Sequence, residues 1–348
     1  MDLGKVFDVG PSGRCDDFAI GAPVVRWNPK INKWMMWYYC RDSEFPRDVA
    51  PSMGSGRIAV ATSEDGIKWF RHNGPEHAGS ILDISQAEGD FDSAHIGVMD
   101  VTYNKGKWYL WYFGGDHQTL NIKPIKFPNG YEGTTPRGYC MRPGLAISDD
   151  GFSFTKIRAN TPSGAAVELG DYTFKTWPNG VIDDDEFRIY YTATIWGSLE
   201  FVTEYAVSKD AKSWNVRGPI IWSTPPTKID AKGVMSRHIS INPLAEGKKW
   251  LMIYSATSAS SDRSICAAHS DDGIEWSHLY EEPILHAGES GAWDDGGVET
   301  PQLVMNGSAV YLYYYGVTAA NNSNNVTSGV GLAISKTGDL RQFKRVSA

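Results

Sequence analysis

Cysteine is scarce in this sequence, and its placement excludes several kinds of site. The four cysteines are Cys15, Cys40, Cys140 and Cys266, and no two of them form a CxxC pair. A zinc knuckle needs closely spaced ligands of that kind, so none is expected. Because the four lie far apart along the chain, we expect free buried thiols of an intracellular protein rather than a disulfide framework.

Long runs of positive charge and of apolar residues are absent as well. The chain has 33 Lys and Arg against 41 Asp and Glu, a formal net charge of −8, without a basic block. A nucleic-acid partner is therefore not expected. Since no stretch of 18 apolar residues occurs, the sequence predicts no membrane span. The N-terminus, MDLGKVFDVG, has neither a basic start nor an apolar segment, so we expect no signal peptide and a cytoplasmic location.

Amphipathic helical periodicity is also missing, and a repeat takes its place. One phrase recurs five times: an apolar strand, a serine, a turn with Asp or Gly, and an aromatic residue, as in IAVATSEDGIKW. Its serines are Ser63, Ser148, Ser208, Ser270 and Ser335. Asp-Gly between alternating residues is typical of a tight β-hairpin. This turn chemistry accounts for Asp65, Asp150 and Asp272, which we therefore exclude as catalytic candidates.

A second phrase precedes each hairpin and completes the repeat. It consists of an apolar strand, a turn and an aromatic strand, as in GVMDVTYNKGKWYLWYFGG. Each repeat then holds four strands, and five such units predict an all-β fold, a five-bladed β-propeller with four antiparallel strands per blade. The whole chain, 1–348, is expected to form one domain. The predicted blades cover approximately residues 15–74, 89–159, 171–218, 233–281 and 291–346.

The topology of a blade predicts where a ligand would bind. The first strand of each blade is innermost, and its start lies on the same face as the loop between the second and third strands. The longest insertions are in two of these loops, ending at Arg57 in blade 1 and at Arg142 in blade 2. Loops this long within a domain are usually functional. We therefore expect a pocket at the centre of that face.

Polar residues at the starts of the innermost strands should line this pocket. They are Asp16, Asp17, Asp92, His95, Asp100, Lys175, Trp177, Arg237, His238, Asp294, Asp295 and Glu299. Converging carboxylates suit glycoside cleavage, in which one acid protonates the leaving oxygen and another activates water or attacks the sugar. The loop acids would equally suit turn capping, and Arg237 with His238 would equally suit a satisfied core pair. Asp100 and Glu299 lie in apolar strand phrases, where capping explains them less well.

These phrases resemble the arabinanase, levansucrase and invertase superfamily of five-bladed glycoside hydrolases. In that superfamily, an Asp of blade 1, a second Asp and a Glu at innermost strand starts carry the chemistry. Asp17 lies near the first position, although Ala22-Pro23 stands where the family has Asp-Pro. Asp100 in MDVTYN resembles the second Asp. Glu299 in VETPQL resembles the Glu-x-Pro phrase of the acid, although the family has this Glu in a middle blade and Glu299 is in the last.

The resemblance implies an enzyme that cleaves or rearranges a glycosidic substrate, either an oligosaccharide or a smaller molecule. Asp17 would be the base or nucleophile, Asp100 the transition-state stabiliser and Glu299 the acid. The expected substrate-binding residues are His95, Trp177 as a stacking platform, Arg237, His238, Asp92 and Lys175. No cofactor is predicted and no metal ligand is assigned, which leaves room for a central structural ion such as calcium.

A second hypothesis uses the same pocket without hydrolysis. The chain would then be a lyase or isomerase, or a protein that binds a carbohydrate or another small molecule. Geometry separates the two hypotheses, because hydrolysis requires Asp17, Asp100 and Glu299 to converge on one cavity.

Overall fold

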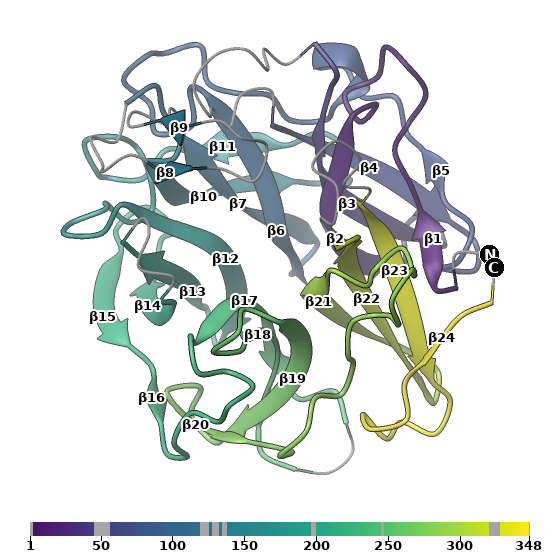
Figure 1. The fold of residues 1–348 in the computed structure, drawn as a ribbon. Helices are drawn as coiled ribbons and strands as arrows, with labels where there is room; N and C mark the ends of the chain where they lie inside the picture. Colours follow the sequence, from purple (N-terminus) through teal and green to yellow (C-terminus); the bar gives the residue numbers. More distant parts are fainter. Residues whose placement is uncertain are drawn as a thin grey trace.

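A computed structural model describes residues 3–44, 56–118, 125–126, 132–133, 138–195, 200–244, 247–319 and 328–347. Five twisted antiparallel sheets stand around a central axis, each with its first long strand innermost (Figure 1). The innermost strands contact one another in the cyclic order β2, β6, β12, β17, β21 and back to β2. The predicted five-bladed β-propeller is confirmed.

The strands of each blade follow one another outward from the axis. Blade 1 contains β2 (Ala19–Asn28), β3 (Lys33–Arg41), β4 (Arg57–Ser63) and β5 (Phe70–Arg71). Blade 2 contains β6 (His95–Asn104), β7 (Lys107–Gly115), β10 (Met141–Ser148) and β11 (Thr155–Ile157). Blade 3 contains β12 (Phe174–Asp183), β13 (Glu186–Thr194), β14 (Val202–Ser208) and β15 (Asn215–Pro219).

The last two blades each have an additional short strand at the outer edge. Blade 4 contains β17 (Val234–Ile241), β18 (Trp250–Thr257), β19 (Arg263–Ser270), β20 (Glu275–His278) and β16 (Ile221–Trp222), which runs parallel to β20. Blade 5 contains β21 (Gly297–Asn306), β22 (Ala309–Val317), β23 (Ser328–Ser335), β24 (Lys344–Arg345) and β1 (Lys5–Phe7). Outside the blades lie a two-stranded ribbon and a short 3-10 turn: β8 (Ile125–Lys126), β9 (Glu132–Gly133) and η1 (His77–Gly79).

The N-terminal strand closes the ring. β1 pairs with β23 of blade 5, so the start of the chain completes the last blade. The two termini consequently lie side by side in Figure 1. Closure of this kind leaves the ring without an open seam between its first and last blades.

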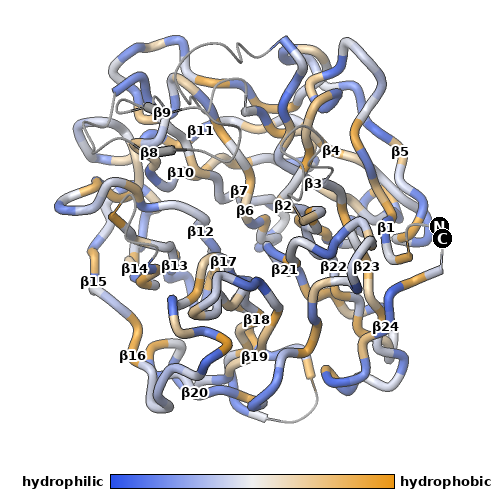
Figure 2. The backbone as a smooth tube through the Cα atoms, in the orientation of Figure 1, coloured by the Kyte–Doolittle hydropathy of each residue, from blue (hydrophilic) through white to orange (hydrophobic). Residues whose placement is uncertain are grey.

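The serine hairpins are structural, as the sequence predicted. In blade 2, the Ser148 hydroxyl donates to Asp150 and accepts from the backbone N–H of Gly151. The same contacts recur at Ser63 in blade 1 and at Ser270 in blade 4. Figure 2 shows hydrophilic residues in such peripheral turns and hydrophobic stretches along the strands.

The hydrophobic core is divided among the seams between blades. Trp37 of blade 1 and Trp108 of blade 2 are fully buried against each other, with ring centroids 5.2 Å apart. A buried aromatic ring of this size removes about 150–250 Å² from water, so each seam is a substantial source of stability. The four cysteines are free and buried. Among the described residues there is no helix long and apolar enough to cross a membrane.

Candidate functional site at the ring axis

Each of the five innermost strands breaks its pairing register at the same level. In three of them the break contains an X-Pro pair, Ala22-Pro23, Trp177-Pro178 or Thr300-Pro301. Ala22, Trp177 and Thr300 all have positive φ, at 46°, 51° and 43°. Non-glycine residues in this region are strained, and such bulges often re-aim side chains near sites. We call the side on which the inner strands begin the front end, and the other side the back end.

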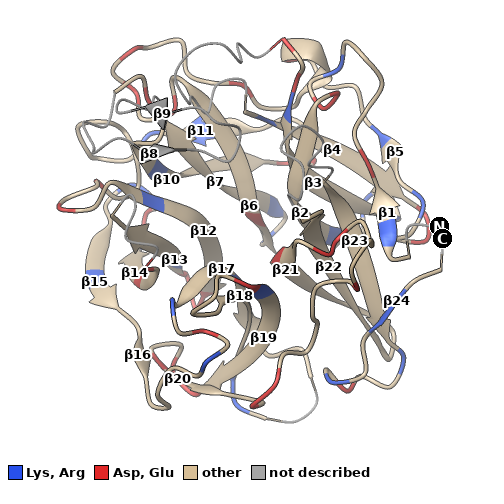
Figure 3. Ribbon diagram, in the orientation of Figure 1, with Lys and Arg blue, Asp and Glu red and all other residues tan. Residues whose placement is uncertain are grey.

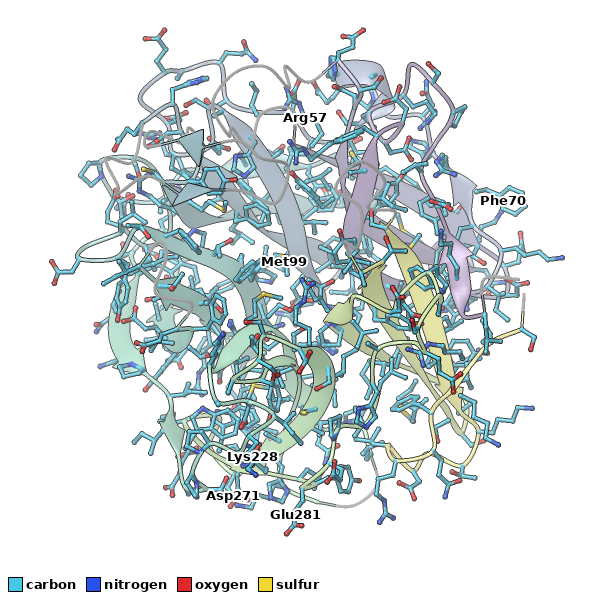
Figure 4. All side chains as sticks on the ribbon, viewed as in Figure 1. Arg57, Phe70, Met99, Lys228, Asp271 and Glu281 are labelled. Atoms are coloured by element: carbon cyan, nitrogen blue, oxygen red, sulfur yellow. The ribbon has the colours of Figure 1, made fainter. Side chains whose placement is uncertain are left out.

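Apolar and aromatic side chains gather at the front end. The buried members of this front cluster are Ala22, Met99, Phe113 and Met141, and its partly buried members are Tyr39, Tyr139, Phe174 and Trp177. Met99 marks the centre of the ring in Figure 4, whereas the labelled Phe70 and Glu281 lie at the periphery. Partly exposed aromatic rings on several blades form the kind of surface on which sugars stack.

Arg237 holds the strained Trp177 bulge in place. The guanidinium donates to the carbonyl oxygen of Trp177 at 3.4 Å and to the hydroxyl of Thr192. Arg237 is fully buried, and burial lowers its pKa to about 9. The structure therefore brings together two of the predicted substrate-binding residues, with Arg237 positioning Trp177 from the neighbouring blade.

Glu299 is a buried carboxylate at the front end. It lies on β21 directly before the bulge, opposite Tyr315 on β22, and its side chain is 11% exposed. Its Oε1 accepts from Nη1 of Arg263, and Nη2 of Arg263 donates to the carbonyl of Gly296 at 3.1 Å. Burial raises the pKa of Glu299, and Arg263 acts in the opposite direction.

The front cluster reaches Glu299 through Tyr315. Gly21 of β2 pairs with Tyr39, and a side chain at Gly21 would meet the Tyr315 ring at 3.3 Å. Glycine at this position lets the aromatic rings of blades 5 and 1 approach each other. Glu299, Tyr315 and Tyr39 are thus consecutive neighbours around the front end.

Asp100 lies behind the bulge and has all its acceptor sites occupied. Its Oδ1 accepts from Arg26 at 2.6 Å and from the Val101 backbone at 2.8 Å. Its Oδ2 accepts from the Gly180 backbone at 3.1 Å and from the Asn179 side chain. Burial raises the pKa of Asp100, against the lowering effect of Arg26 and of these hydrogen bonds.

The contacts of Asp100 belong to a polar ring with one member from each blade. Arg26 also donates to Gln302 at 2.9 Å and lies 3.2 Å from Nε2 of His238. The members of this axial ring are Arg26, Asp100, Asn179, His238 and Gln302. Figure 3 shows acidic positions on the central strands β6 and β21. The axial ring ties all five blades together at the centre.

A cavity of about 400 Å³ opens behind the axial ring. Arg26, Asp100 and His238 line it, together with residues from the second halves of β6, β12, β17 and β21. The structure therefore brings Asp100 and His238 together, in a cavity at the back end of the axis. The front-end loops that were expected to overhang a pocket, residues 45–55 and most of 119–137, lie outside the described residues.

Asp17, predicted as base or nucleophile, accepts hydrogen bonds from the loop backbone around it. Its two oxygens accept from the backbone N–H groups of Gly13 at 2.8 Å and Ser43 at 2.6 Å. Burial acts to raise its pKa, but these bonds and the Ser43 hydroxyl outweigh it and lower the pKa of Asp17 overall. Asp295 of blade 5 makes the same pair of bonds, to Gly291 and Ala319. Among the described residues, no contact joins Asp17 to Asp100 or Glu299.

Asp92 belongs to a triad that recurs around the ring. It accepts from the Tyr112 hydroxyl at 2.9 Å and from Lys156 at 2.5 Å. Matching triads of Asp, Tyr and a basic residue are Asp16–Tyr38–Arg71, Asp230–Tyr254–His278 and Asp294–Tyr314–Arg345. The recurrence marks Asp92 as a part of the blade framework.

Lys175 lies on β12, the innermost strand of blade 3, whereas the basic residues of these triads lie on the fourth strands of their blades. It lies 3.5 Å from Glu204 and over the ring of Tyr191, which occupies the same strand position as Tyr112. His95, at the start of β6, is fully buried against Phe113, and neither of its ring nitrogens has a hydrogen-bond partner in the described part of the chain. Burial, together with Arg41 and Arg57, lowers the pKa of His95 to about 3, so it is neutral.

Sequence reasoning missed Arg26, Asn179 and Gln302 of the axial ring. A signal was available, because all three follow an X-Pro pair within three residues, in APVVR, WPN and TPQ. It also missed Arg263, which comes from the neighbouring blade and shares no motif with Glu299. No group of three His, Cys, Asp or Glu side chains is placed to hold a metal ion within the residues described.

Comparison with known proteins places this geometry in a structural class. No protein-family model and no curated protein sequence matches the chain. A glycoside hydrolase of known structure matches with a TM-score of 0.65 at 17% identity, covering 99% of this chain and 93% of that one. A thermostable family-43 glycoside hydrolase matches with a TM-score of 0.60 at 18% identity, covering 98% of this chain and 95% of that one.

A deacetylase shares the fold as well. One match is the N-acetylgalactosamine deacetylase from F. plautii, which was solved in complex with blood group B trisaccharide. Its TM-score is 0.62 at 16% identity, and the match covers 96% of each chain. The chain therefore has the fold of the five-bladed glycoside hydrolases. At these identities the likeness extends to the fold and not to the reaction.

Proposed function

We propose that the chain is a glycoside-processing protein that binds its sugar at the front end and uses Glu299 as the acid. The observation that carries this proposal is the position of Glu299, a buried carboxylate on an innermost strand, opposite Tyr315, whose ring packs on the Gly21 position beside Tyr39 of the front cluster. Proton donation to a glycosidic oxygen requires a carboxyl group that holds its proton near the working pH. Burial raises the pKa of Glu299 and so acts toward this property, while the ion pair with Arg263 acts against it.

The aromatic residues would orient the sugar. Trp177 would present its ring to a sugar face, fixed by the bond from Arg237 to its carbonyl. Among the proteins of the same fold, the deacetylase was solved in complex with blood group B trisaccharide. This likeness supports a ligand of the same chemical class for this chain, an oligosaccharide or glycoside.

A non-hydrolytic function is the second candidate, and one observation favours it. The oxygens of Asp17 and Asp100 are occupied by hydrogen bonds, and Ala22 stands where the resemblance expects a carboxylate. Cleavage by either glycosidase mechanism needs two carboxyl groups, and Glu299 alone provides only one. The chain would then bind a glycan, or catalyse a proton transfer that one carboxyl group can perform.

One experiment separates these two functions. The wild-type protein, Glu299→Gln and Asp17→Asn are assayed for binding and turnover of a panel of oligosaccharides and aryl glycosides. We expect Glu299→Gln to bind with little change and to lose turnover by about 100-fold or more, the range for a general acid. Asp17→Asn should retain turnover. Saturable binding without turnover in the wild type selects the non-hydrolytic function, and no binding of any glycan contradicts both.

A further inference from the structure

The cavity at the back end of the axis has a polar floor and apolar walls. Arg26, Asp100 and His238 form the floor, and Val101, Val181 and Leu303 contribute to the walls. At its rim, Tyr103 is 39% exposed and Ile241 is 43% exposed, although both are large and apolar. A volume of about 400 Å³ lies in the range of small-molecule pockets.

The charges of the floor cancel. Arg26 and Asp100 form an ion pair at 2.6 Å, and Arg26 is further held by Gln302. His238 is neutral, because burial and then the charge of Arg26 lower its pKa well below its ordinary value. The floor therefore offers no unpaired cation to an anionic ligand, and Asp100 would repel a second carboxylate.

His238 has a hydrogen-bond donor facing each of its ring nitrogens. The backbone N–H of Leu303 points at Nδ1 from 3.2 Å, and Nη2 of Arg26 lies 3.2 Å from Nε2. A neutral imidazole accepts only one hydrogen bond, so it cannot satisfy both donors. If Nδ1 accepts from Leu303, the ring proton is on Nε2. The Nε2–H group of His238 and the Nη2–H group of Arg26 are then two donors that face each other at the floor, with no acceptor between them.

We propose that this back cavity binds a small neutral molecule with an apolar body and one accepting oxygen, as in a ketone, amide or ester. The carbonyl oxygen would accept from both Nε2–H of His238 and Nη2 of Arg26, which supplies the acceptor that the floor lacks. The apolar body would lie against the walls. A glycan fits this site poorly, because its many hydroxyl groups would find few partners there.

The site is independent of the proposed glycan site. Glu299 lies before the bulge and the inner-strand residues of the front cluster lie before or within it, whereas the back cavity is lined by residues after it. Glycan binding at the front end can therefore fail while binding in the back cavity succeeds, and the reverse also holds.

Three probes of similar size test the chemistry of the ligand. Acetanilide has a neutral carbonyl, benzoate has a carboxylate, and ethylbenzene has no acceptor. Dissociation constants come from saturation-transfer NMR titrations of the full chain. We expect acetanilide to bind at least about tenfold more tightly than either comparison probe, since one well-placed hydrogen bond accounts for such a factor. Equal or tighter binding of benzoate or ethylbenzene would overturn the proposal, as would no saturable binding of acetanilide.

Rim variants test the location. Ile241→Trp should fill the opening and weaken acetanilide binding at least about tenfold, a loss of about 1.4 kcal/mol. Ile221→Trp is the matched control, because Ile221 is also an exposed isoleucine but lies at the outer edge of blade 4. Met305→Trp, at the same cavity on blade 5, provides a second variant if Ile241→Trp folds poorly. Unchanged affinity in a folded rim variant would show that the ligand binds elsewhere.

Discussion

Arg26 and Asp100 join blade 1 to blade 2 across the axis, with 2.6 Å between Nη2 and Oδ1. The side chain of Asp100 is 2% exposed and that of Arg26 is 21% exposed. This pair is the centre of the axial ring, so Asp100, expected at first to stabilise a transition state, has a clear structural role. The carboxylate has no accepting position left for a substrate in the absence of rearrangement.

Removing this pair should therefore destabilise the fold. We expect Asp100→Asn to lower the free energy of unfolding by about 3 kcal/mol, because it leaves the Arg26 charge buried without its partner. Urea denaturation followed by tryptophan fluorescence measures the change. Arg26→Met combined with Asp100→Asn should cost clearly less than the sum of the single variants. Strict additivity would show that the pair contributes no coupling.

Arg263 should set the pH dependence of any acid catalysis by Glu299. Burial raises the pKa of Glu299 above its ordinary value, so the protonated acid persists to higher pH and activity falls as pH rises through that pKa. Arg263 lowers the same pKa, so Arg263→Met should move the falling limb of kcat/KM to higher pH. The measurement is a pH profile of both proteins on one substrate. A limb that stays in place would show that Glu299 is not the titrating acid.

The strain at Trp177 provides a matched pair of variants. Because Trp177 has a φ of 51°, Trp177→Gly should be more stable than Trp177→Ala by about 1 kcal/mol, since only glycine adopts this conformation at no cost. Both variants remove the ring and should weaken glycan binding at least about tenfold. Thermal unfolding and binding titrations give the two quantities. Unaltered binding in both would exclude Trp177 as a stacking platform.

Ala22 offers a test by gain of function. It lies at the front end in the position where the resemblance expects Asp, and aspartate tolerates a φ of 46° better than most residues. Ala22→Asp should add a second carboxyl group near Glu299 and raise glycoside turnover by about 100-fold, the lower end of the range for acid–base assistance. Ala22→Asn is the control with the same shape and no charge. If the two variants turn over equally, a missing carboxylate is not what limits hydrolysis.

The fold was predictable because its signals are local and repeated. The serine hairpin and the aromatic strand each recur five times, and a repeated unit of four strands has few ways to bury its faces. The recurrence also shows what a single position cannot. The structural role of Asp92 becomes clear only when it is compared with Asp16 and Asp294, which make the same contacts in other blades. The role of β1 was not predictable, because three residues without a motif pair with the other end of the chain.

The site was less predictable because its contacts cross between blades. Asp100 and His238 meet through Arg26, which comes from a third blade, and Glu299 is held by Arg263 of its neighbour. A residue of an inner strand lies at the front end or the back end according to whether it precedes or follows the bulge. The sequence shows the bulge only as an X-Pro pair. Asp17 was a candidate by position, but the backbone amides around it come from loops that no strand pattern predicts.

A crystal structure of Glu299→Gln soaked with a panel of oligosaccharides tests the central claim most directly. We predict a sugar ring against Trp177, with a glycosidic oxygen within about 3 Å of the side-chain amide that replaces the carboxyl group of Glu299, which is the reach of a general acid. A sugar bound away from the front cluster, or a glycosidic oxygen held far from position 299 in a bound complex, would contradict the proposal.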